Sequence, residues 1–390
     1  MKPSCRRWRL AGIVVVAAVT AACTVSPPDA WPPALHANHP PEVACTALPN
    51  ATAPVIRTSG QRSPLDMPPV AGGLADVTAR SSSSALAIGA TRPRPPRSTA
   101  LVAVWNGATW KTLSDRALPP KASPAAGALF PGGAWVVGEY GLTDRGDGGG
   151  VGSPLILRVT GTTMRRVPVP KLRYSSALED VAASSATDAW AVGFTGRGPL
   201  VLHWNGTAWT RTQLPATLEH RVMAVDAVAA TSAVNAWAVI RFRTGSSPRL
   251  MHWNGSQWGD VVMPDIGMRY GLYGVAATSA RNVWAVGAGA ILHWNGRTWS
   301  CASISNTLYT VSTSSADNTW AVGGGAGEAV ALHWNGHTWQ QQVLNPSPHH
   351  AYFLQDVAII PRSGRAWAVG STESAANQTL MFHWNGTAWH

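Results

Sequence analysis

The tetrapeptide His-Trp-Asn-Gly occurs five times in the chain, and this repeat constrains the fold more than any other feature. The copies begin at His203, His252, His293, His333 and His383, and each has a second Trp five residues after its first. An Asn-Gly pair between two apolar runs predicts a hairpin, because both central residues of a type I′ turn have positive φ. Each copy therefore predicts two antiparallel strands.

Two shorter patterns precede each hairpin. A Trp within a small apolar run recurs at Trp190, Trp237, Trp284, Trp320 and Trp367. Further upstream, a second run begins at Asp180, Asp226, Gly274 and Asp356. We interpret these Asp residues as turn or cap residues, because they recur with the repeat. Three patterns per repeat predict four short strands, which together make one blade of a β-propeller.

Two more divergent copies lie on the N-terminal side. One has its hairpin at Trp105, and the other keeps the turn glycine Gly161 but has lost both Trp. The predicted blades span 76–115, 125–170, 180–214, 226–263, 274–304, 310–344 and 356–390. We therefore predict an all-β, seven-bladed β-propeller over residues 73–390. The alternative is six blades plus an irregular N-terminal region.

The repeats differ mostly in the loop between their second and third strands. Trp284 and Trp294 are 10 residues apart, whereas Trp367 and Trp384 are 17 apart. Loops of changing length on one face of a constant frame are where propellers hold their specificity. The ring face that carries these loops is the predicted binding surface.

The first 22 residues have the features of a secretory signal peptide: basic residues, an apolar run from Leu10 to Val19 and a small-residue end. Cys23 follows Ala21-Ala22, so the segment resembles a bacterial lipoprotein signal, in which that Cys is lipidated. Thr20 stands where that family prefers Leu, Val or Ile, which leaves ordinary cleavage after Ala22 as an alternative. We expect export, either to the outer face of the membrane through this lipid alone or into the medium.

Residues 23–72 are rich in Pro, Ala and Ser, which predicts an extended tether. The last blade ends abruptly at His390, so its fourth strand is only begun. Because a ring needs its ends joined, we expect a stretch within 43–66 to pair with the last blade and close it.

Two cysteines remain in the exported part, Cys45 and Cys301. An isolated pair in an exported protein most often forms a disulfide, with two free thiols as the alternative. Their spacing matches no metal motif. The repeated His residues belong to different blades, so we expect structural hydrogen bonds next to Trp rather than a metal site.

Charged residues make up only 13% of the chain, and its formal net charge is +11. Without the signal peptide, 26 basic and 19 acidic residues remain, an excess that fits contact with a polyanionic surface such as cell-wall polymers. No nucleic-acid recognition motif is present, and export disfavours that function. The sequence also contains no nucleophile elbow, phosphate loop or zinc signature, so we expect neither enzyme activity nor a cofactor.

The Val-Trp-Ala-Val-Gly and His-Trp-Asn-Gly-x-x-Trp patterns resemble tryptophan-rich propeller repeats of secreted actinobacterial proteins. They are more distantly similar to the lectin propellers of the tectonin and tachylectin type. This resemblance implies the propeller fold. For the function, we expect a monomeric cell-surface module that binds a glycan or cell-wall polymer. We interpret most repeated Trp as packing residues; the weak candidates for ligand contact are Trp204, Trp253, Trp294, Trp334 and Trp384.

Two alternative functions stay open. One is a protein–protein scaffold of the cell envelope, which would expose a broad apolar patch. The other is a propeller hydrolase or lyase acting on polysaccharide. That enzyme would bring carboxylates with perturbed pKa values together at one mouth of the channel.

Overall fold

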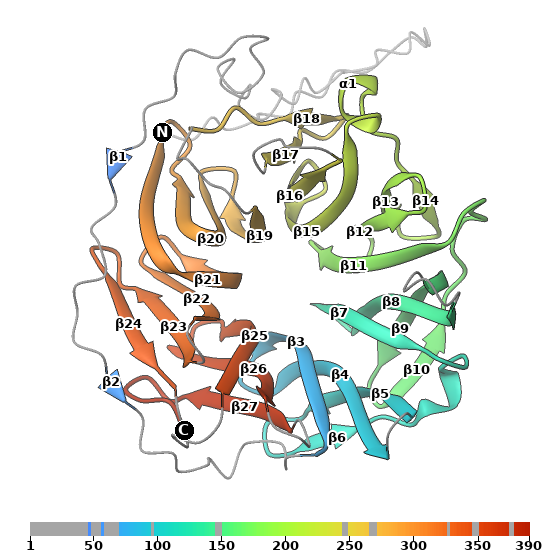
Figure 1. Cartoon of the computed structure of the whole chain (residues 1–390), viewed down its shortest axis with the longest axis horizontal. Helices are drawn as coiled ribbons and strands as arrows, with labels where there is room; N and C mark the ends of the chain where they lie inside the picture. Colours follow the sequence, from blue (N-terminus) through green and yellow to red (C-terminus); the bar gives the residue numbers. More distant parts are fainter. Residues whose placement is uncertain are drawn as a thin grey trace, which may run out of the picture. The chain divides into compact units, whose positions relative to one another are not determined.

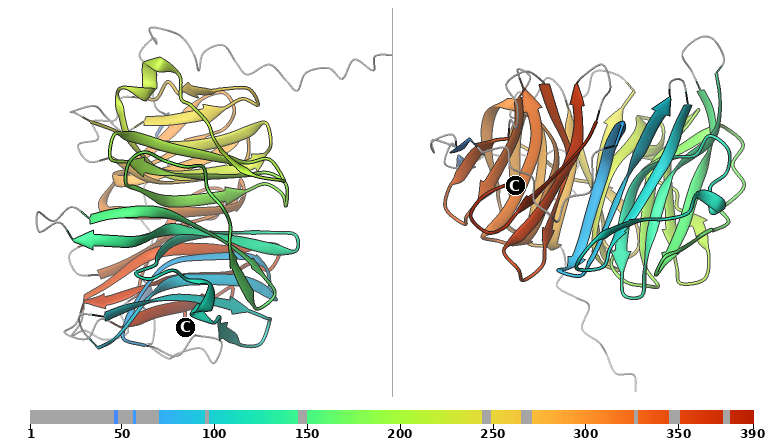
Figure 2. Two further views of the ribbon diagram at one scale, coloured as in Figure 1. Left: turned by 90° about the vertical axis from the view of Figure 1, so that its right-hand side faces the viewer. Right: turned by 90° about the horizontal axis from the view of Figure 1, so that it is seen from below.

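The computed structural model of the chain describes residues 46–47, 56–57, 70–94, 97–144, 150–243, 249–264, 271–325, 328–344, 351–373 and 378–390. These residues form an all-β propeller whose twisted antiparallel sheets surround a central channel (Figure 1). Figure 2 shows neighbouring sheets packed face to face around the ring. No helix in the described part of the chain is long and apolar enough to cross a membrane.

Four sheets have four strands each. The first contains β3 (Gly72–Ser81), β4 (Ser84–Arg94), β5 (Arg97–Trp105) and β6 (Trp110–Thr112). The second contains β7 (Ser123–Phe130), β8 (Gly133–Asp144), β9 (Gly150–Thr160) and β10 (Thr163–Arg166). The third contains β11 (Ser176–Ala183), β12 (Ala189–Thr195), β13 (Gly198–Trp204) and β14 (Trp209–Arg211). The fourth contains β15 (Val222–Ser232), β16 (Asn235–Phe242), β17 (Arg249–Trp253) and β18 (Trp258–Asp260).

The next two repeats share one eight-stranded sheet, and the last repeat forms a sheet of three strands. The large sheet contains β19 (Leu272–Ser279), β20 (Asn282–Trp294), β21 (Trp299–Ser315), β22 (Asn318–Gly325), β23 (Glu328–Trp334) and β24 (Trp339–Val343), with β1 (Thr46–Ala47) and β2 (Ile56–Arg57) added. The last sheet contains β25 (Ala351–Ile360), β26 (Arg365–Glu373) and β27 (Thr379–Trp384). Among the described residues, two short helices, η2 (Asp115–Ala117) and α1 (Ala216–Glu219), lie in connections.

The described strands thus form six hydrogen-bonded sheets, and the prediction of seven separate blades is wrong in this count. The physical reason is strand β21, which pairs with β20 through its first half and with β22 through its second half. It therefore joins the predicted fifth and sixth blades into one sheet. The number of sheets fits the six-blade alternative.

Of the stretch 43–66, which was predicted to close the ring, the structure describes only β1 and β2, and for the rest the pairing stays a prediction. Strand β1 runs parallel to β21, with Ala47 opposite Cys301, and β2 runs parallel to β24, with Ile56 opposite Gln342. Neither strand pairs with the last sheet. The last sheet instead meets the first one directly, because β25 and β26 pack against β3.

A short segment before β3 completes this seam between the last and first sheets. The Thr379 N–H donates to the Val70 carbonyl over 3.0 Å, and the Val70 N–H donates to the Thr379 hydroxyl over 3.0 Å. The chain end adds two backbone hydrogen bonds of 3.0 Å between His383 and His390. In the last sheet the fourth-strand position is represented by one isolated bridge, Trp384 to Trp389.

The hairpins lie where the sequence predicts them, but their turns are not of type I′. In the third sheet Trp204 pairs with Trp209, so four residues form the loop. Gly206 has φ of +94°, whereas Asn205 has no positive φ. The Asn205 side-chain oxygen instead accepts hydrogen bonds from the two N–H groups that follow Gly206, each 3.0 Å long. Asn is therefore selected here as an acceptor for backbone donors, as in an Asx turn.

A disulfide between Cys45 and Cys301 stays a prediction. Cys301 is disulfide-bonded; Cys45 lies outside the described residues, directly before β1. Peptide mapping of the unreduced protein is expected to recover these two cysteines in one cross-linked peptide. The double variant Cys45→Ser/Cys301→Ser is expected to lose about 2–4 kcal/mol of unfolding free energy. Recovery of Cys301 linked to another cysteine would contradict the pairing.

Candidate functional site

The five Trp residues considered for ligand contact do not form an open stacking surface. Trp204, Trp294, Trp334 and Trp384 are buried, and Trp253 is half-buried. In several repeats this Trp donates its indole N–H to a carbonyl of the preceding turn, as Trp204 does to Ala186 over 3.2 Å. These side chains pack between sheets, as Trp204 does against Trp135 with ring centroids 4.9 Å apart. The structure therefore supports the packing interpretation of these Trp residues, and ligand contact by any of them stays a prediction.

The repeated His residues are structural as well. His293 stacks on Trp284 with ring centroids 3.9 Å apart, and its Nε2 lies 2.8 Å from the side-chain oxygen of Asn282. The same arrangement, a third-strand His bonded to an Asx side chain, recurs at His203, His252 and His333. Burial lowers the pKa of His293 and His333 to about 4, so both are neutral at physiological pH. No cluster of metal-ligating side chains occurs in the described part of the chain.

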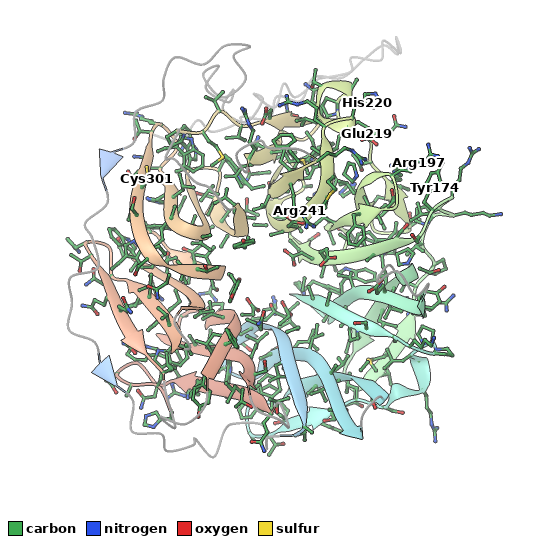
Figure 3. The ribbon with its side chains drawn as sticks, viewed as in Figure 1. Tyr174, Arg197, Glu219, His220, Arg241 and Cys301 are labelled. Carbon is green, nitrogen blue, oxygen red and sulfur yellow. The ribbon has the colours of Figure 1, made fainter. Side chains whose placement is uncertain are left out.

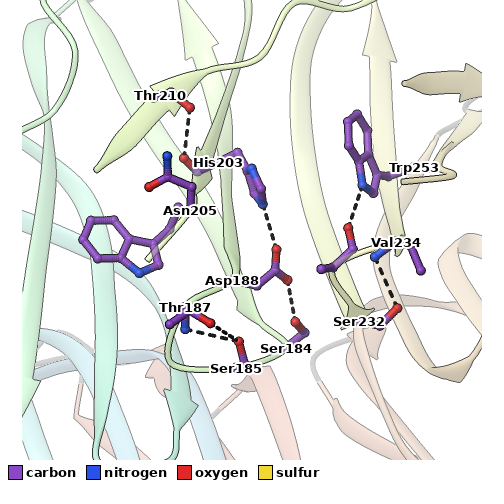
Figure 4. Close-up of polar contacts among 12 residues, drawn as sticks. Ser184, Ser185, Thr187, Asp188, His203, Asn205, Thr210, Ser232, Val234 and Trp253 are labelled. Carbon is purple, nitrogen blue, oxygen red and sulfur yellow. Dashed lines mark hydrogen bonds and ion pairs between the residues drawn. The ribbon is translucent and has the colours of Figure 1, made fainter. Parts of the chain in front are cut away.

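One repeat has Asp in place of Asn and gives a polar relay that could be mistaken for a catalytic triad (Figure 4). The Ser184 hydroxyl donates to Asp188, whose other oxygen lies 2.7 Å from Nε2 of His203. In a catalytic triad the imidazole stands between the hydroxyl and the carboxylate. Here the carboxylate is in the middle, so the imidazole cannot take the serine proton. The relay therefore supports a structural role.

The recurring Asp residues are neither turn nor cap residues, which corrects the sequence interpretation. Asp180 lies within β11, directly after a β-bulge, and accepts a hydrogen bond of 2.8 Å from the Val228 N–H in the next sheet. The same bond to the next sheet is made by Asp76 to Gly127 and by Asp356 to Val77. We call these three contacts the Asp clasps. They join the innermost strands of neighbouring sheets around the channel.

Asp226 was aligned with these residues on sequence but does not belong to them. The pairing of Ala229 with Trp237 and of Ala182 with Trp190 shows that Ala227 is equivalent to Asp180. Asp226 occupies the preceding bulge position and forms an ion pair of 2.9 Å with Arg241.

A cavity of about 270 Å³ lies in the channel, and two of the clasp residues, Asp76 and Asp356, line it. Burial, followed by the nearby charges of Asp356 and Asp180, raises the pKa of Asp76 well above its usual value. Burial also raises the pKa of Asp180 to about 7 and that of Asp356 to about 6.

A basic concave surface made of two adjoining cavities lies beside the second and third sheets. The first cavity, of about 450 Å³, is lined by Tyr140 on β8, by Arg166 on β10 and by the connection that follows β10. The second, of about 330 Å³, is lined by the same connection, by Arg197 in the β12–β13 turn, and by Arg211. Both cavities share Lys171 and Tyr174, and together we call them the rim groove.

The connection in the middle of the groove is fixed by alternating side chains. Val167 is buried and donates its N–H to the Ile156 carbonyl over 2.9 Å. Val169 and Leu172 pack against the core between the second and third sheets. Lys171, Arg173 and Tyr174 are exposed on the opposite side. The prolines at 168 and 170 restrict the backbone further, so the groove wall is held in place before any ligand arrives.

Tyr174 is placed by two hydrogen bonds of its neighbours. The Ser176 hydroxyl donates to the Tyr174 carbonyl over 2.8 Å, and the Gly196 N–H donates to the Ser175 carbonyl over 2.8 Å. These bonds bring the Tyr174 ring beneath Arg197, whose guanidinium carbon lies 4.9 Å from the ring centroid. Figure 3 shows the two side chains together on the outer rim.

The rim groove was missed as a site because none of its residues recurs with the repeat. The usable signal was the density of Arg, Lys, Pro and Tyr over residues 165–174. Its position nevertheless agrees with the predicted binding face, because Thr195 and Gly198 end the hairpin between the second and third strands.

The fold and these sites define a tryptophan-rich β-propeller with an acidic channel and a basic rim groove. No protein-family model and no curated protein matches the chain. Among solved structures, the YCF48 protein bound to a D1 peptide is 15% identical with a TM-score of 0.54, over 87% of this chain and 97% of that chain. YCF48 from Cyanidioschyzon merolae is 16% identical with a TM-score of 0.52, over 81% and 96%. A chain of the mitotic checkpoint complex is 13% identical with a TM-score of 0.51, over 90% and 98%. At these identities the likeness shows the propeller fold alone.

Proposed function

We propose that this protein is a binding module that holds an extended glycan or cell-wall polymer at the outer cell surface. The observation that carries the proposal is the rim groove, two adjoining cavities of about 450 and 330 Å³ with a shared wall. Ligand sites are usually preformed concavities with aromatic walls and a few placed polar groups. Two cavities in succession suit a chain better than a single small molecule.

Export and anchoring belong to the same proposal. The segment 1–22 would direct export, and a lipid on Cys23 would hold the chain at the membrane surface. The Pro-rich segment 23–72 would then act as a tether for a monomeric propeller.

Removal of either groove tyrosine is expected to weaken polymer binding. The full chain would be screened against an array of glycans and cell-wall polymers, with affinities then measured by calorimetry. Tyr140→Ala and Tyr174→Ala are each expected to raise Kd about tenfold, the usual effect of truncating a central aromatic contact. The matched control is Tyr273→Ala, because Tyr273 is 40% exposed against 44% for Tyr174 but lies on β19 in another sheet.

An array without saturable binding, or equal losses in Tyr174→Ala and the control, would contradict the proposal. The runner-up, an envelope protein as partner, would then be tested next. It is favoured by the solved propeller that holds a peptide.

A polysaccharide hydrolase or lyase is a second candidate, favoured by the carboxyls of raised pKa in the channel. Against it, each of the three accepts a backbone N–H of a neighbouring strand, which favours a structural role. Shortened polymer chains after incubation in the same screen would support the enzyme.

A further inference from the structure

We infer that the polymer in the rim groove is anionic, and that two guanidinium groups stacked on tyrosine rings are its anion subsites. The inference rests on the proposed function and narrows it to a chemical class. Each cavity contributes one such pair. Arg166 lies over Tyr140 and Arg197 over Tyr174, both with 4.9 Å from the guanidinium carbon to the ring centroid.

Stacking on a tyrosine ring orients a guanidinium group so that it can bind an anion. The ring covers one face of the group and limits its rotation, while the N–H donors at its edge stay available. Those donors match a carboxylate or phosphate in a bidentate arrangement. Since the orientation is fixed beforehand, less conformational entropy is lost when an anion binds.

The charged side chains around the rim groove also favour an anionic polymer. Arg166, Lys171, Arg173 and Arg197 form no ion pair with any residue that the structure describes. Glu219 is the single carboxylate among the residues that line the two cavities, and it already accepts from Arg211 over 3.4 Å and from the Leu214 N–H over 3.3 Å. A neutral polymer would partly desolvate these cations without pairing them, whereas an anionic polymer would pair them.

Lys171 links the two cavities of the rim groove. It lines both cavities and is exposed between the two Arg–Tyr pairs. A polymer with a negative charge on successive units could therefore contact Arg166, Lys171 and Arg197 along one path. Acidic groups gather elsewhere, at the channel, so the positive field of the groove is a local property.

The test compares three probes on the full chain: polygalacturonate with carboxylates, poly(glycerol phosphate) with phosphodiesters, and neutral dextran. We expect saturable binding of at least one anionic probe, none of dextran, and weaker binding as salt increases. Arg166→Gln/Arg197→Gln is expected to raise Kd roughly 100-fold, about tenfold for each charged contact, and to flatten the salt dependence. The control Arg80→Gln/Arg297→Gln removes the same charge from exposed arginines of other sheets and is expected to change Kd less than about twofold.

The two anionic probes distinguish a carboxylate from a phosphate ligand, and either result supports the inference. Equal losses in the double variant and the control would overturn it, because nonspecific attraction would then explain binding. Binding of dextran that Tyr174→Ala weakens and the arginine variant does not would overturn the anionic ligand while leaving the proposed function intact. Binding of poly-glutamate with no binding of any polysaccharide or polyphosphodiester would overturn both in favour of an acidic peptide.

Discussion

Trp367→Ala is expected to lower the free energy of unfolding by about 3–5 kcal/mol, the usual cost of removing a buried Trp. Trp367 is 1% exposed and packs edge-on against Trp105 and Trp110 of the first sheet, with centroid distances of 5.5 Å to each. It therefore fills the seam where the last sheet meets the first. Denaturant titration measures the loss.

The matched control is Trp135→Ala. Trp135 is fully buried and packs against Trp204 and Trp209 in the same way, but between two sheets that follow each other in the chain. A similar loss of global stability is expected in both variants. Hydrogen exchange should differ, since only Trp367→Ala is expected to speed exchange in β3 and β25 before the rest of the ring. A loss below about 1 kcal/mol for Trp367→Ala would show that the seam does not depend on this contact.

The protein is expected to lose stability as pH rises from about 6.5 to 8, by about 1–3 kcal/mol. Asp180 has a pKa of about 7 and Asp356 of about 6 in the fold, against about 3.9 in an unfolded chain. A raised acid pKa stabilises the fold fully below the unfolded pKa, and this contribution disappears as pH rises through the folded pKa. Asp76, whose pKa is also raised, acts in the same direction.

At lower pH, the buried histidines make the free energy of unfolding change with pH in the opposite direction. Burial lowers the pKa of His293, His333 and His383 to about 4, against about 6.5 when unfolded. Their contribution is complete above the unfolded pKa and is lost as pH falls through the folded one. Between about pH 4 and 6.5 the histidines and the carboxyls change the free energy of unfolding in opposite directions. The carboxyl effect therefore stands alone only above about pH 6.5.

The variant Asp180→Asn isolates the contribution of Asp180 to the pH dependence of stability. The amide oxygen can still accept from the Val228 N–H, but it does not ionise. Urea titrations at pH 6 and pH 8 are expected to show about 1 kcal/mol less difference in the variant than in the parent protein. An unchanged difference would mean that Asp180 does not carry the pH dependence.

The periodicity of the sequence predicted those structural features that recur in the repeats. Each His-Trp-Asn-Gly copy forms a hairpin, and the propeller fold, the packing role of the paired Trp and the structural role of His203 and its equivalents all follow from that pattern. Features set by register could not be predicted. Both strands have a β-bulge, but Asp180 follows it and reaches the next sheet, whereas Asp226 occupies the bulge itself and does not.

Features outside the repeat were also beyond sequence reasoning. The cavities form only where Tyr140, Lys171 and Arg197 come together from three separate segments, and no local spacing encodes that meeting. The same holds for β1, because two residues of a Pro-rich segment carry no signal for the strand they join.

The continuity of β21 gives the ring an uneven mechanical character. Among the described strands, β21 is the one that pairs with strands of two successive repeats, whereas the other repeats share no strand. Tension applied across the ring is therefore expected to open the seam before it separates the two repeats that share β21. A circular permutant, in which the present ends are joined and the chain is cut at another inter-sheet connection, should keep the ring intact. A permutant with its new ends within residues 299–315 should not, because the cut would fall in β21.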